Sequence, residues 1–381
     1  MGKYLKKFQN HSQYESYIAT NYVKPNVSYC VSENEVHYNP FSYADEYLTF
    51  EVVEGGTITF AKNDSQAQDC PILYSTDNGT TWTELTPTTT SQELGGTLSV
   101  GDKVLVKGTN AQYALNPIYY NRFGGTAKVN ISGNIMSLIG GDNFSETVTF
   151  TERFALYGIF SNYSNLLSAE NLILPATTLV DDCYCNMFRN CTNLVNAPKS
   201  LPATTLTIQC YCNMFRNCTN LVNAPELPAE TLAGYCYGYM FSGCTSLTTA
   251  PELPATTLAQ DCYYFMFQGC TGLTTAPALP ATTLASNCYG YMFDGCTSLT
   301  TAPELPATTL AQSCYSSMFR GCTSLNYIKA TFTTTPSSTY TSNWVNGVSA
   351  TGTFVKNSAA TWTTTGNNGI PTGWTVETAS A

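Results

Sequence analysis

Hydrophobic and polar positions recur with a fixed period through the middle of the chain. From residue 174 to residue 325 a block of about 26 residues repeats, with the pattern L-P-A-T-T-L-x-x-x-C-Y-x-x-M-F-x-x-C-T-x-L-x-x-A-P. Its copies begin at Leu174, Leu201, Leu227, Leu253, Leu279 and Leu305. A period of this length is typical of stacked supersecondary units, so it predicts a solenoid. A solenoid offers a long surface for binding and seldom a converging pocket for catalysis.

Each copy contains apolar residues spaced four positions apart. In the fourth copy these are Leu258, Cys262, Met266 and Cys270, a spacing that predicts one stripe of a short helix. The residue types do not change between copies, so we expect equivalent side chains to lie over one another. The predicted core residues of three central copies are Cys236, Met240, Cys244, Cys262, Met266, Cys270, Cys288, Met292 and Cys296. Pro277 cannot donate a backbone hydrogen bond, so we expect only short strands in the extended leg.

Alternating apolar residues predict β structure on both sides of the repeats. Leu48–Val53 alternates, and Asp77-Asn78-Gly79 is a strong hairpin turn, as in an immunoglobulin-like β-sandwich. The expected segments are an immunoglobulin-like sandwich at 45–130, a solenoid with an N-terminal cap at 131–328, and a C-terminal β cap at 329–381. Within the N-terminal cap, residues 154–174 form a degraded copy of the repeat, which a solenoid needs at its end.

Residues 1–44 form a distinct N-terminal segment. Ser12-Gln13-Tyr14-Glu15 is a capping-box pattern that predicts a short helix ending before Pro25. Val27 to Val36 alternates like a pair of strands. The segment is either a small structural cap or a peg that docks to a partner.

Charge is sparse, at 11% of residues, and the net charge of −10 with a pI near 4.7 argues against nucleic-acid binding. No apolar run long enough to cross a membrane occurs, and no apolar segment follows the basic start Met1-Gly2-Lys3 as a secretory signal requires. We therefore expect no membrane insertion. We expect either a mature fragment or a protein that leaves its cell by lysis or another route.

The sixteen cysteines lie mostly at two fixed places in each copy. If the stretch between Cys262 and Cys270 is helical, their Cα atoms are about 12 Å apart, too far for a disulfide. Equivalent cysteines on neighbouring copies are about 5 Å apart, which permits one. Buried free thiols are the favoured interpretation, because cysteine packs as a small hydrophobe. A zinc site is disfavoured, since the only histidines, His11 and His37, lie far from the repeats. We expect no metal and no cofactor.

The repeat resembles the BspA-like leucine-rich repeats, whose signature is A-F-x-G-C-x-x-L-x-x-I-x-I-P. Met266-Phe267-Gln268-Gly269-Cys270-Thr271-Gly272-Leu273 matches it closely. Ala-Pro replaces isoleucine, and the first cysteine is an addition, so the strand should be irregular. The resemblance implies a mainly β fold with short helices, built as a leucine-rich-repeat solenoid after the immunoglobulin-like β-sandwich. It also implies a role in surface adhesion and recognition, not catalysis.

The two ends carry a second resemblance. Residues 6–11, 24–30 and 35–40 are similar to an N-terminal module of virion proteins in phages of gut Bacteroidetes (the crAss-like group). Residues 344–348 and 369–376 are similar to a tail shared by gut-bacterial and phage surface proteins. This resemblance implies that the protein assembles with other virion proteins.

Three further patterns have competing interpretations. Ser75 to Trp82 fits the Asp-box pattern S-x-D-x-G-x-T-W of sialidase-like propellers, but the sandwich lacks the arginine cluster of a glycosidase. A structural hairpin is favoured over a lectin-like contact. One repeat column varies between copies, and its aromatic members Tyr239, Phe265 and Tyr291 are the candidate ligand-binding residues; partial packing between copies is the alternative. A sparse acidic column is favoured as a solvated edge; its members are Glu226, Glu252 and Glu304.

These patterns favour a non-enzymatic protein of the virion. In this hypothesis residues 1–44 dock to other virion proteins, the sandwich spaces the repeats outward, and the repeats bind a glycan or protein on the host surface, in a homo-oligomer. The first alternative is a bacterial cell-surface leucine-rich-repeat adhesin. The second is a carbohydrate-active enzyme, which is disfavoured because no catalytic triad, phosphate loop or paired-carboxylate site is present.

Overall fold

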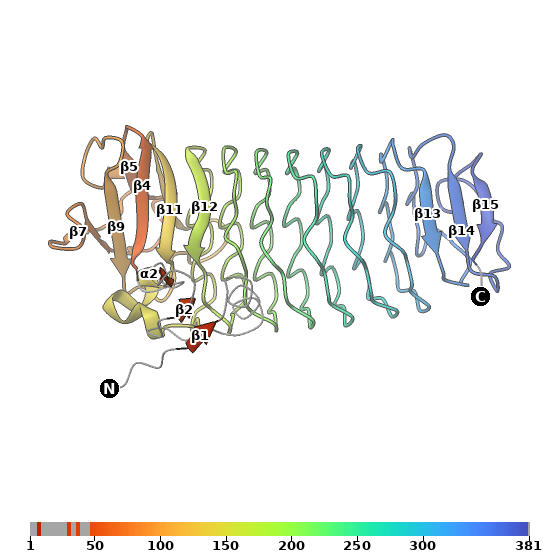
Figure 1. Ribbon diagram of the computed structural model, residues 1–381, viewed down its shortest axis with the longest axis horizontal. Helices are drawn as coiled ribbons and strands as arrows, with labels where there is room; N and C mark the ends of the chain where they lie inside the picture. Colours follow the sequence, from red (N-terminus) through yellow and green to blue (C-terminus); the bar gives the residue numbers. More distant parts are fainter. Residues whose placement is uncertain (1–5, 9–28, 32–35, 39–45, 380–381) are drawn as a thin grey trace.

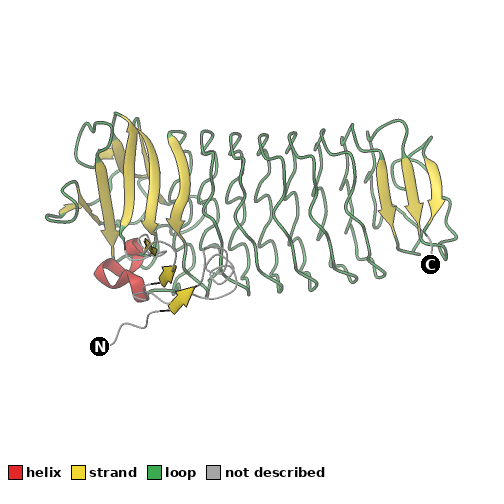
Figure 2. Ribbon diagram, viewed as in Figure 1, coloured by secondary structure: helices red, strands yellow, loops and turns green. Residues whose placement is uncertain are grey.

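The computed structural model describes residues 6–8, 29–31, 36–38 and 46–379. Strands at either end of an elongated molecule flank a stack of similar rungs (Figures 1 and 2). The helices of the described part are the short α2 (Ser137–Gly140) and the 3-10 helix η1 (Gly141–Glu146), both outside the repeats. Neither has the length and apolar character needed to cross a membrane. The mainly β class predicted from the sequence is confirmed.

Two sheets form the N-terminal end of the molecule. The larger has the strand order β12-β11-β4-β9-β6-β7 and the smaller β10-β5-β8. The strands are β4 (Leu48–Glu54), β5 (Ile58–Lys62), β6 (Ile72–Ser75), β7 (Thr83–Leu85), β8 (Gln92–Glu93), β9 (Lys103–Gly108), β10 (Asn121–Gly125), β11 (Lys128–Asn134) and β12 (Leu166–Ile173). The alternation read from the sequence sets the two faces of β4: Phe50 and Val52 are buried, whereas Glu51 is exposed.

The larger sheet continues directly into the stack. Strand β11 runs through residue 130, where the sequence suggested a boundary, and pairs in parallel with β12. Strand β12 then bridges to the next rung through Ser168 and Asn196. One continuous hydrophobic core extends from Leu48 to Trp374, beside a small second cluster around Phe154 and Tyr157. The sheets and the rungs therefore share one core.

The helix predicted within each repeat is wrong. Backbone N–H groups alternate between two partners: Phe267 N donates to Met292 O of the next rung at 2.9 Å, whereas Met266 N donates to Tyr263 O at 3.1 Å. Every fourth residue is left-handed, as at Phe265 (φ 57°) and Gly269 (φ 70°). A run of turns thus returns an apolar residue to the core every four positions. This run of turns has the same spacing of apolar residues as a helix, but half of its backbone N–H groups donate to the neighbouring rung.

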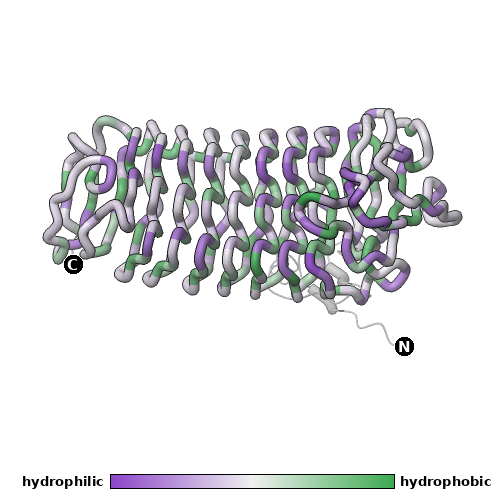
Figure 3. The backbone as a smooth tube through the Cα atoms, turned by 180° about the vertical axis from the view of Figure 1, so that it is seen from behind, coloured by the Kyte–Doolittle hydropathy of each residue, from purple (hydrophilic) through white to green (hydrophobic). Residues whose placement is uncertain are grey.

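Equivalent side chains stack along the rungs, as predicted. The rings of Phe241 and Phe267 lie 5.6 Å apart at an interplanar angle of 5°. This ladder begins at Phe160, which stacks on Phe188 at 5.4 Å, so the degraded copy at 154–174 is a true rung. Seen from behind, each rung alternates between hydrophobic and hydrophilic residues (Figure 3).

Strand pairing in the extended leg is even more limited than the short strands that the prolines predicted. Adjacent rungs pair there through isolated bridges, such as Thr249 with Thr275 and Thr301 with Tyr327, and not through continuous strands. Proline lacks the N–H group that a longer ladder would need.

The stack continues past the last recognisable copy. Phe319 N donates to Trp344 O at 2.8 Å, in the same way that Phe267 N donates to Met292 O. Gly347 is again left-handed (φ 79°), as Gly269 is. A parallel sheet of β13 (Tyr327–Ala330), β14 (Thr353–Lys356) and β15 (Thr375–Thr378) ends the molecule. Trp344 is fully buried and packs against the end of the core.

Three short strands are described in the N-terminal segment: β1 (Lys6–Phe8), β2 (Tyr29–Val31) and β3 (Val36–Tyr38). Strand β2 pairs in parallel with β1 and antiparallel with β3, so the predicted strand pair is confirmed. The helix predicted from Ser12 lies outside the described residues.

Candidate binding surface

The three candidate aromatic residues occupy adjacent rungs of the turn leg. Tyr239 and Phe265 stack with ring centroids 4.6 Å apart at 5°, and Phe265 and Tyr291 stack at 4.3 Å and 10°. Each side chain is half-buried. Packing between rungs and partial exposure therefore occur together, and one edge of the stack meets solvent.

The backbone at this column is left-handed in every rung. Tyr239, Phe265 and Tyr291 have φ values of 55°, 57° and 55°. Bulky side chains rarely adopt this conformation, which glycine, asparagine and aspartate tolerate. The same column holds such tolerant residues in other rungs: Gly158, Asn186, Asn213 and Asn343. Three aromatic residues therefore stand where the backbone favours asparagine or glycine, at a local cost of about 1–3 kcal/mol each.

Two further tyrosines, which sequence reasoning missed, enlarge the column into a patch. Tyr264 contacts Phe265 edge-to-face at 4.4 Å, and Tyr235 lies 6.2 Å from Tyr239. Glycines make room for them, since a Cβ on Gly238 would lie 2.6 Å from the Tyr235 ring and one on Gly290 would lie 3.0 Å from the Tyr264 ring. The sequence signal for this space was glycine at positions 238 and 290, in a repeat column that otherwise holds cysteine, tyrosine or serine. We call Tyr235, Tyr239, Tyr264, Phe265 and Tyr291 the aromatic shelf.

A row of polar side chains runs beside the aromatic shelf. This row, the shelf rim, consists of Arg216, Ser242, Gln268, Asp294 and Arg320. Its central members are joined from rung to rung: Ser242 Oγ donates to Gln268 Oε1 at 3.2 Å, and Gln268 Nε2 donates to Asp294 Oδ2 at 3.4 Å.

The arginines of the shelf rim cover the two ends of the shelf. The Arg216 guanidinium lies 4.8 Å from the Tyr239 ring centroid, and that of Arg320 lies 5.4 Å from the Tyr291 ring. Arg320 also binds Asp294 through two hydrogen bonds of 2.9 and 2.7 Å. The shelf thus presents a row of aromatic ring edges, with donors and acceptors held along one side.

The other members of the variable column differ in exposure, since Asn213 is half-buried. Asn186 and Ser317 are buried, so variation between copies does not by itself indicate an exposed position in this column. Asn186 donates from Nδ2 to the Tyr157 hydroxyl. Accessible aromatic surface is concentrated on the three central rungs.

The predicted core residues are all buried. Cys236, Met240, Cys244, Cys262, Met266, Cys270, Cys288, Met292 and Cys296 are each 0% exposed. Every cysteine whose side chain is described carries a free thiol. In the second column the thiol donates to a phenylalanine carbonyl of the preceding rung, as Cys270 does to Phe241 at 3.1 Å. Burial raises the pKa of the Cys270 thiol from 9.0 to about 12. These residues stabilise the stack and are not accessible to a ligand.

The Asp-box segment forms a tightly bonded turn. Asp77 accepts hydrogen bonds from Ser75 Oγ at 2.7 Å, from Thr81 N at 2.9 Å and from Thr81 Oγ1 at 2.7 Å, which lower the pKa of its carboxyl to about 2. Trp82 packs edge-on against Tyr47 and under Lys107 Nζ, 4.1 Å from its ring. The residues of the motif are therefore engaged in the turn itself, as the hairpin interpretation requires.

The acidic column lies on the extended leg, away from the shelf. Glu226, Glu252 and Glu304 are exposed, and Glu304 pairs with Lys329 at 2.9 Å. Within the described ranges no group of three or more metal-ligating side chains comes together.

Comparison with known proteins adds little to this geometry. No protein-family model and no curated protein matches the chain. Among solved structures it is similar to a leucine-rich repeat protein from Bacteroides ovatus, at 12% identity over 61% of this chain and 74% of that chain, with a TM-score of 0.22. A TM-score this low supports no argument about fold or function. The leucine-rich-repeat, immunoglobulin-like and phage resemblances thus stay predictions.

Proposed function

We propose that this chain is a non-enzymatic binding protein of the leucine-rich-repeat kind, whose aromatic shelf contacts a glycan or protein on a host surface. In this proposal it belongs to a virion, with residues 1–44 attached to other virion proteins in a homo-oligomer. A bacterial cell-surface adhesin is the alternative setting for the same shelf.

The observation that carries the proposal is the aromatic residues at left-handed positions. Asparagine in other rungs satisfies the same backbone without strain. Stacking between neighbouring rings contributes about 0.5–1.5 kcal/mol per pair, which offsets only part of the strain. Residues retained against a local cost are found more often at functional sites than elsewhere.

The chemistry of the shelf suits sugar rings. The solvent edge of the stacked rings, with Tyr235 and Tyr264 beside it, offers rigid apolar contact area to a sugar ring with little loss of conformational entropy. The shelf rim supplies both donors and acceptors, as hydroxyl groups require. The carboxylate of Asp294 and the guanidinium of Arg320 neutralise each other. Arg216 is the remaining charge of the shelf rim, so the shelf suits a largely neutral glycan, or a partner surface of similar chemistry.

The matched test replaces the three stacked rings with asparagine, as Tyr239→Asn, Phe265→Asn and Tyr291→Asn together. Asparagine fits this backbone column, so the variant should fold, and its binding to host cells or immobilised mucin should fall by about tenfold or more. The control is Tyr119→Asn, which removes a half-buried tyrosine elsewhere. Unchanged binding by a folded triple variant would exclude the shelf.

Two treatments of the host surface identify the partner class. Periodate oxidation of surface glycans should abolish binding if a sugar is recognised, whereas protease treatment should abolish it if a protein is recognised. Mass spectrometry of purified particles tests the virion setting, and surface biotinylation of intact bacteria tests the adhesin setting.

A further inference from the structure

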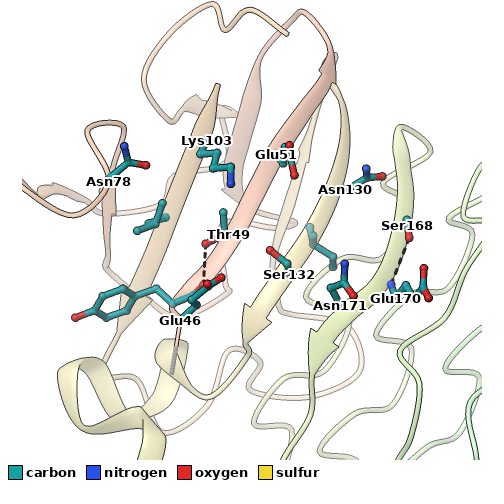
Figure 4. Close-up of a pocket in the computed structure, with 13 residues that line it drawn as sticks. Glu46, Thr49, Glu51, Asn78, Lys103, Asn130, Ser132, Ser168, Glu170 and Asn171 are labelled. Atoms are coloured by element: carbon teal, nitrogen blue, oxygen red, sulfur yellow. Dashed lines mark hydrogen bonds between the residues drawn. The ribbon is translucent and has the colours of Figure 1, made fainter. Parts of the chain in front are cut away.

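The outer face of the larger sheet contains a polar groove where the sheet meets the stack. Its volume is about 560 Å³, and its lining comes from β4, β9, β11 and β12 together with the turn at Asn78 (Figure 4). The core residues of these strands point to the opposite face, because side chains alternate along a strand. The groove is therefore formed mainly by outward-pointing residues, although the buried Ile131 also contributes to its lining.

One row of groove side chains crosses four strands. Lys103 pairs with Glu51, Glu51 with Asn130, and Asn130 with Ser168 as direct cross-strand neighbours. We call these four residues the sheet row. Because strands lie about 4.8 Å apart, the sheet row is about 14 Å long. The bridge from Ser168 to Asn196, and from Asn196 to Asn223, extends it onto the first rungs.

The polar groups of the sheet row are largely unused by the protein. In the described part of the chain, the side chains of Glu51 and Asn130 make no hydrogen bond, and Lys103 forms no ion pair with its neighbour Glu51. Figure 4 shows these side chains standing side by side on the sheet face. A solvated sheet face usually places opposite charges in cross-strand pairs that contact each other. Here donors and acceptors are displayed in the groove without contacting each other.

The charge of the groove limits what it can bind. Glu46, Glu51 and Glu170 line it, with Lys103 as the cation among its lining residues. Burial raises the pKa of the Glu46 carboxyl, and the nearby Lys103 opposes that change. An excess of carboxylates repels acidic sugars and phosphate groups. Carboxylate and amide oxygens accept hydrogen bonds from hydroxyls, while the asparagine amide and the lysine donate to them.

We infer that this groove is a second binding site, separate from the aromatic shelf, that holds a neutral oligosaccharide across the sheet row. The row length fits a chain of a few sugar units lying across the strands. Glu51 and Asn130 at its centre bind hydroxyls, and Lys103 and Ser168 bind at its ends. This site does not depend on the role proposed for the shelf.

The experiment measures binding of neutral oligosaccharides of about three to five units (gluco-, manno-, galacto- and xylo-series) by calorimetry. Galacturonate and chitosan oligomers of equal length serve as acidic and basic probes. The wild-type chain should bind at least one neutral series and no galacturonate. Glu51→Ala and Asn130→Ala should each weaken that binding by about tenfold, since each removes hydrogen bonds to the ligand.

Controls separate this site from the shelf and from loss of folding. Glu152→Ala, at an exposed residue outside the groove, should bind like the wild type. The triple asparagine variant of the shelf should also retain neutral-oligosaccharide binding. Glu51→Gln keeps the shape of the side chain, so weak binding by this variant with an unchanged melting temperature confirms a direct role. No binding to any neutral series, binding confined to chitosan, or binding unaffected by Glu51→Ala and Asn130→Ala would each overturn the inference.

Discussion

Two thiols of one rung, Cys262 and Cys270, should respond differently to replacement by serine. Both are fully buried, and burial raises the pKa of each to about 12. The Cys270 Sγ donates to Phe241 O at 3.1 Å, whereas the Cys262 Sγ has no acceptor within the described residues. A hydroxyl at position 270 therefore finds a partner that the sequence did not reveal, and one at position 262 does not.

The magnitudes follow from this difference. Cys262→Ser places in an apolar core a hydroxyl whose proton has no acceptor, which should lower the free energy of unfolding by about 1–3 kcal/mol. In Cys270→Ser the hydroxyl can donate to Phe241 O, and such a bond contributes about 0.5–1.5 kcal/mol. We expect Cys262→Ser to be less stable than Cys270→Ser by about 1–2 kcal/mol.

Urea unfolding followed by circular dichroism and tryptophan fluorescence measures this difference. The comparison requires that the unfolding free energy of both variants depend equally steeply on urea concentration. Cys262→Ala and Cys270→Ala are matched controls that add no polar group. The Phe241 carbonyl still accepts Cys244 N at 3.0 Å, so the alanine pair should differ by less than about 0.5 kcal/mol. Equal losses in the serine pair, or a larger loss at position 270, would refute the reasoning.

Three other expectations concern stability. Because burial raises the pKa of thiols such as Cys270 from 9.0 to about 12, the folded state keeps them protonated. The urea midpoint should therefore be constant between about pH 6 and about pH 9 and fall as the pH rises towards 12. Arg320→Ala leaves the buried Asp294 without its two charged hydrogen bonds and should lower the free energy of unfolding by about 1–3 kcal/mol, measured by urea unfolding against Arg320→Lys. Deletion of residues 1–44 should leave the melting temperature unchanged, since β1–β3 pair only with one another in the described part, and a lower value would show a structural cap.

The error over the repeat helix has a specific cause. Leucine, cysteine and methionine at four-residue spacing fit one helical stripe, but a chain of turns with a left-handed residue every fourth position produces the same spacing. Aspartate, asparagine and glycine at positions such as Asp261, Asn287 and Gly269 were a signal for the turns. Tyr235 in the column of Asp261 and Asn287, and the aromatic residues of the shelf column, concealed it.

The two candidate surfaces were predictable to different degrees. The column of Tyr239, Phe265 and Tyr291 follows from the period alone, because residues one repeat apart must lie on neighbouring rungs. Tyr235 and Tyr264 join the shelf because adjacent glycines leave space for their rings. The groove could not be predicted, since Lys103, Glu51, Asn130 and Ser168 meet only through strand pairing.

The sequence by itself determined the stacked repeat, its register and its core of leucine, cysteine, methionine and phenylalanine. It could do so because identical residues at a fixed period bury themselves by lying over one another. Only the tertiary structure decided the path of the turn leg, the extra rung around Trp344 and the union of the N-terminal sheets with the stack. The reason is physical: the period places equivalent residues on neighbouring rungs, but it does not specify which backbone N–H groups bond within a rung and which bond to the next rung. Nor does it specify which strands outside the repeats pair, such as β11 with β12.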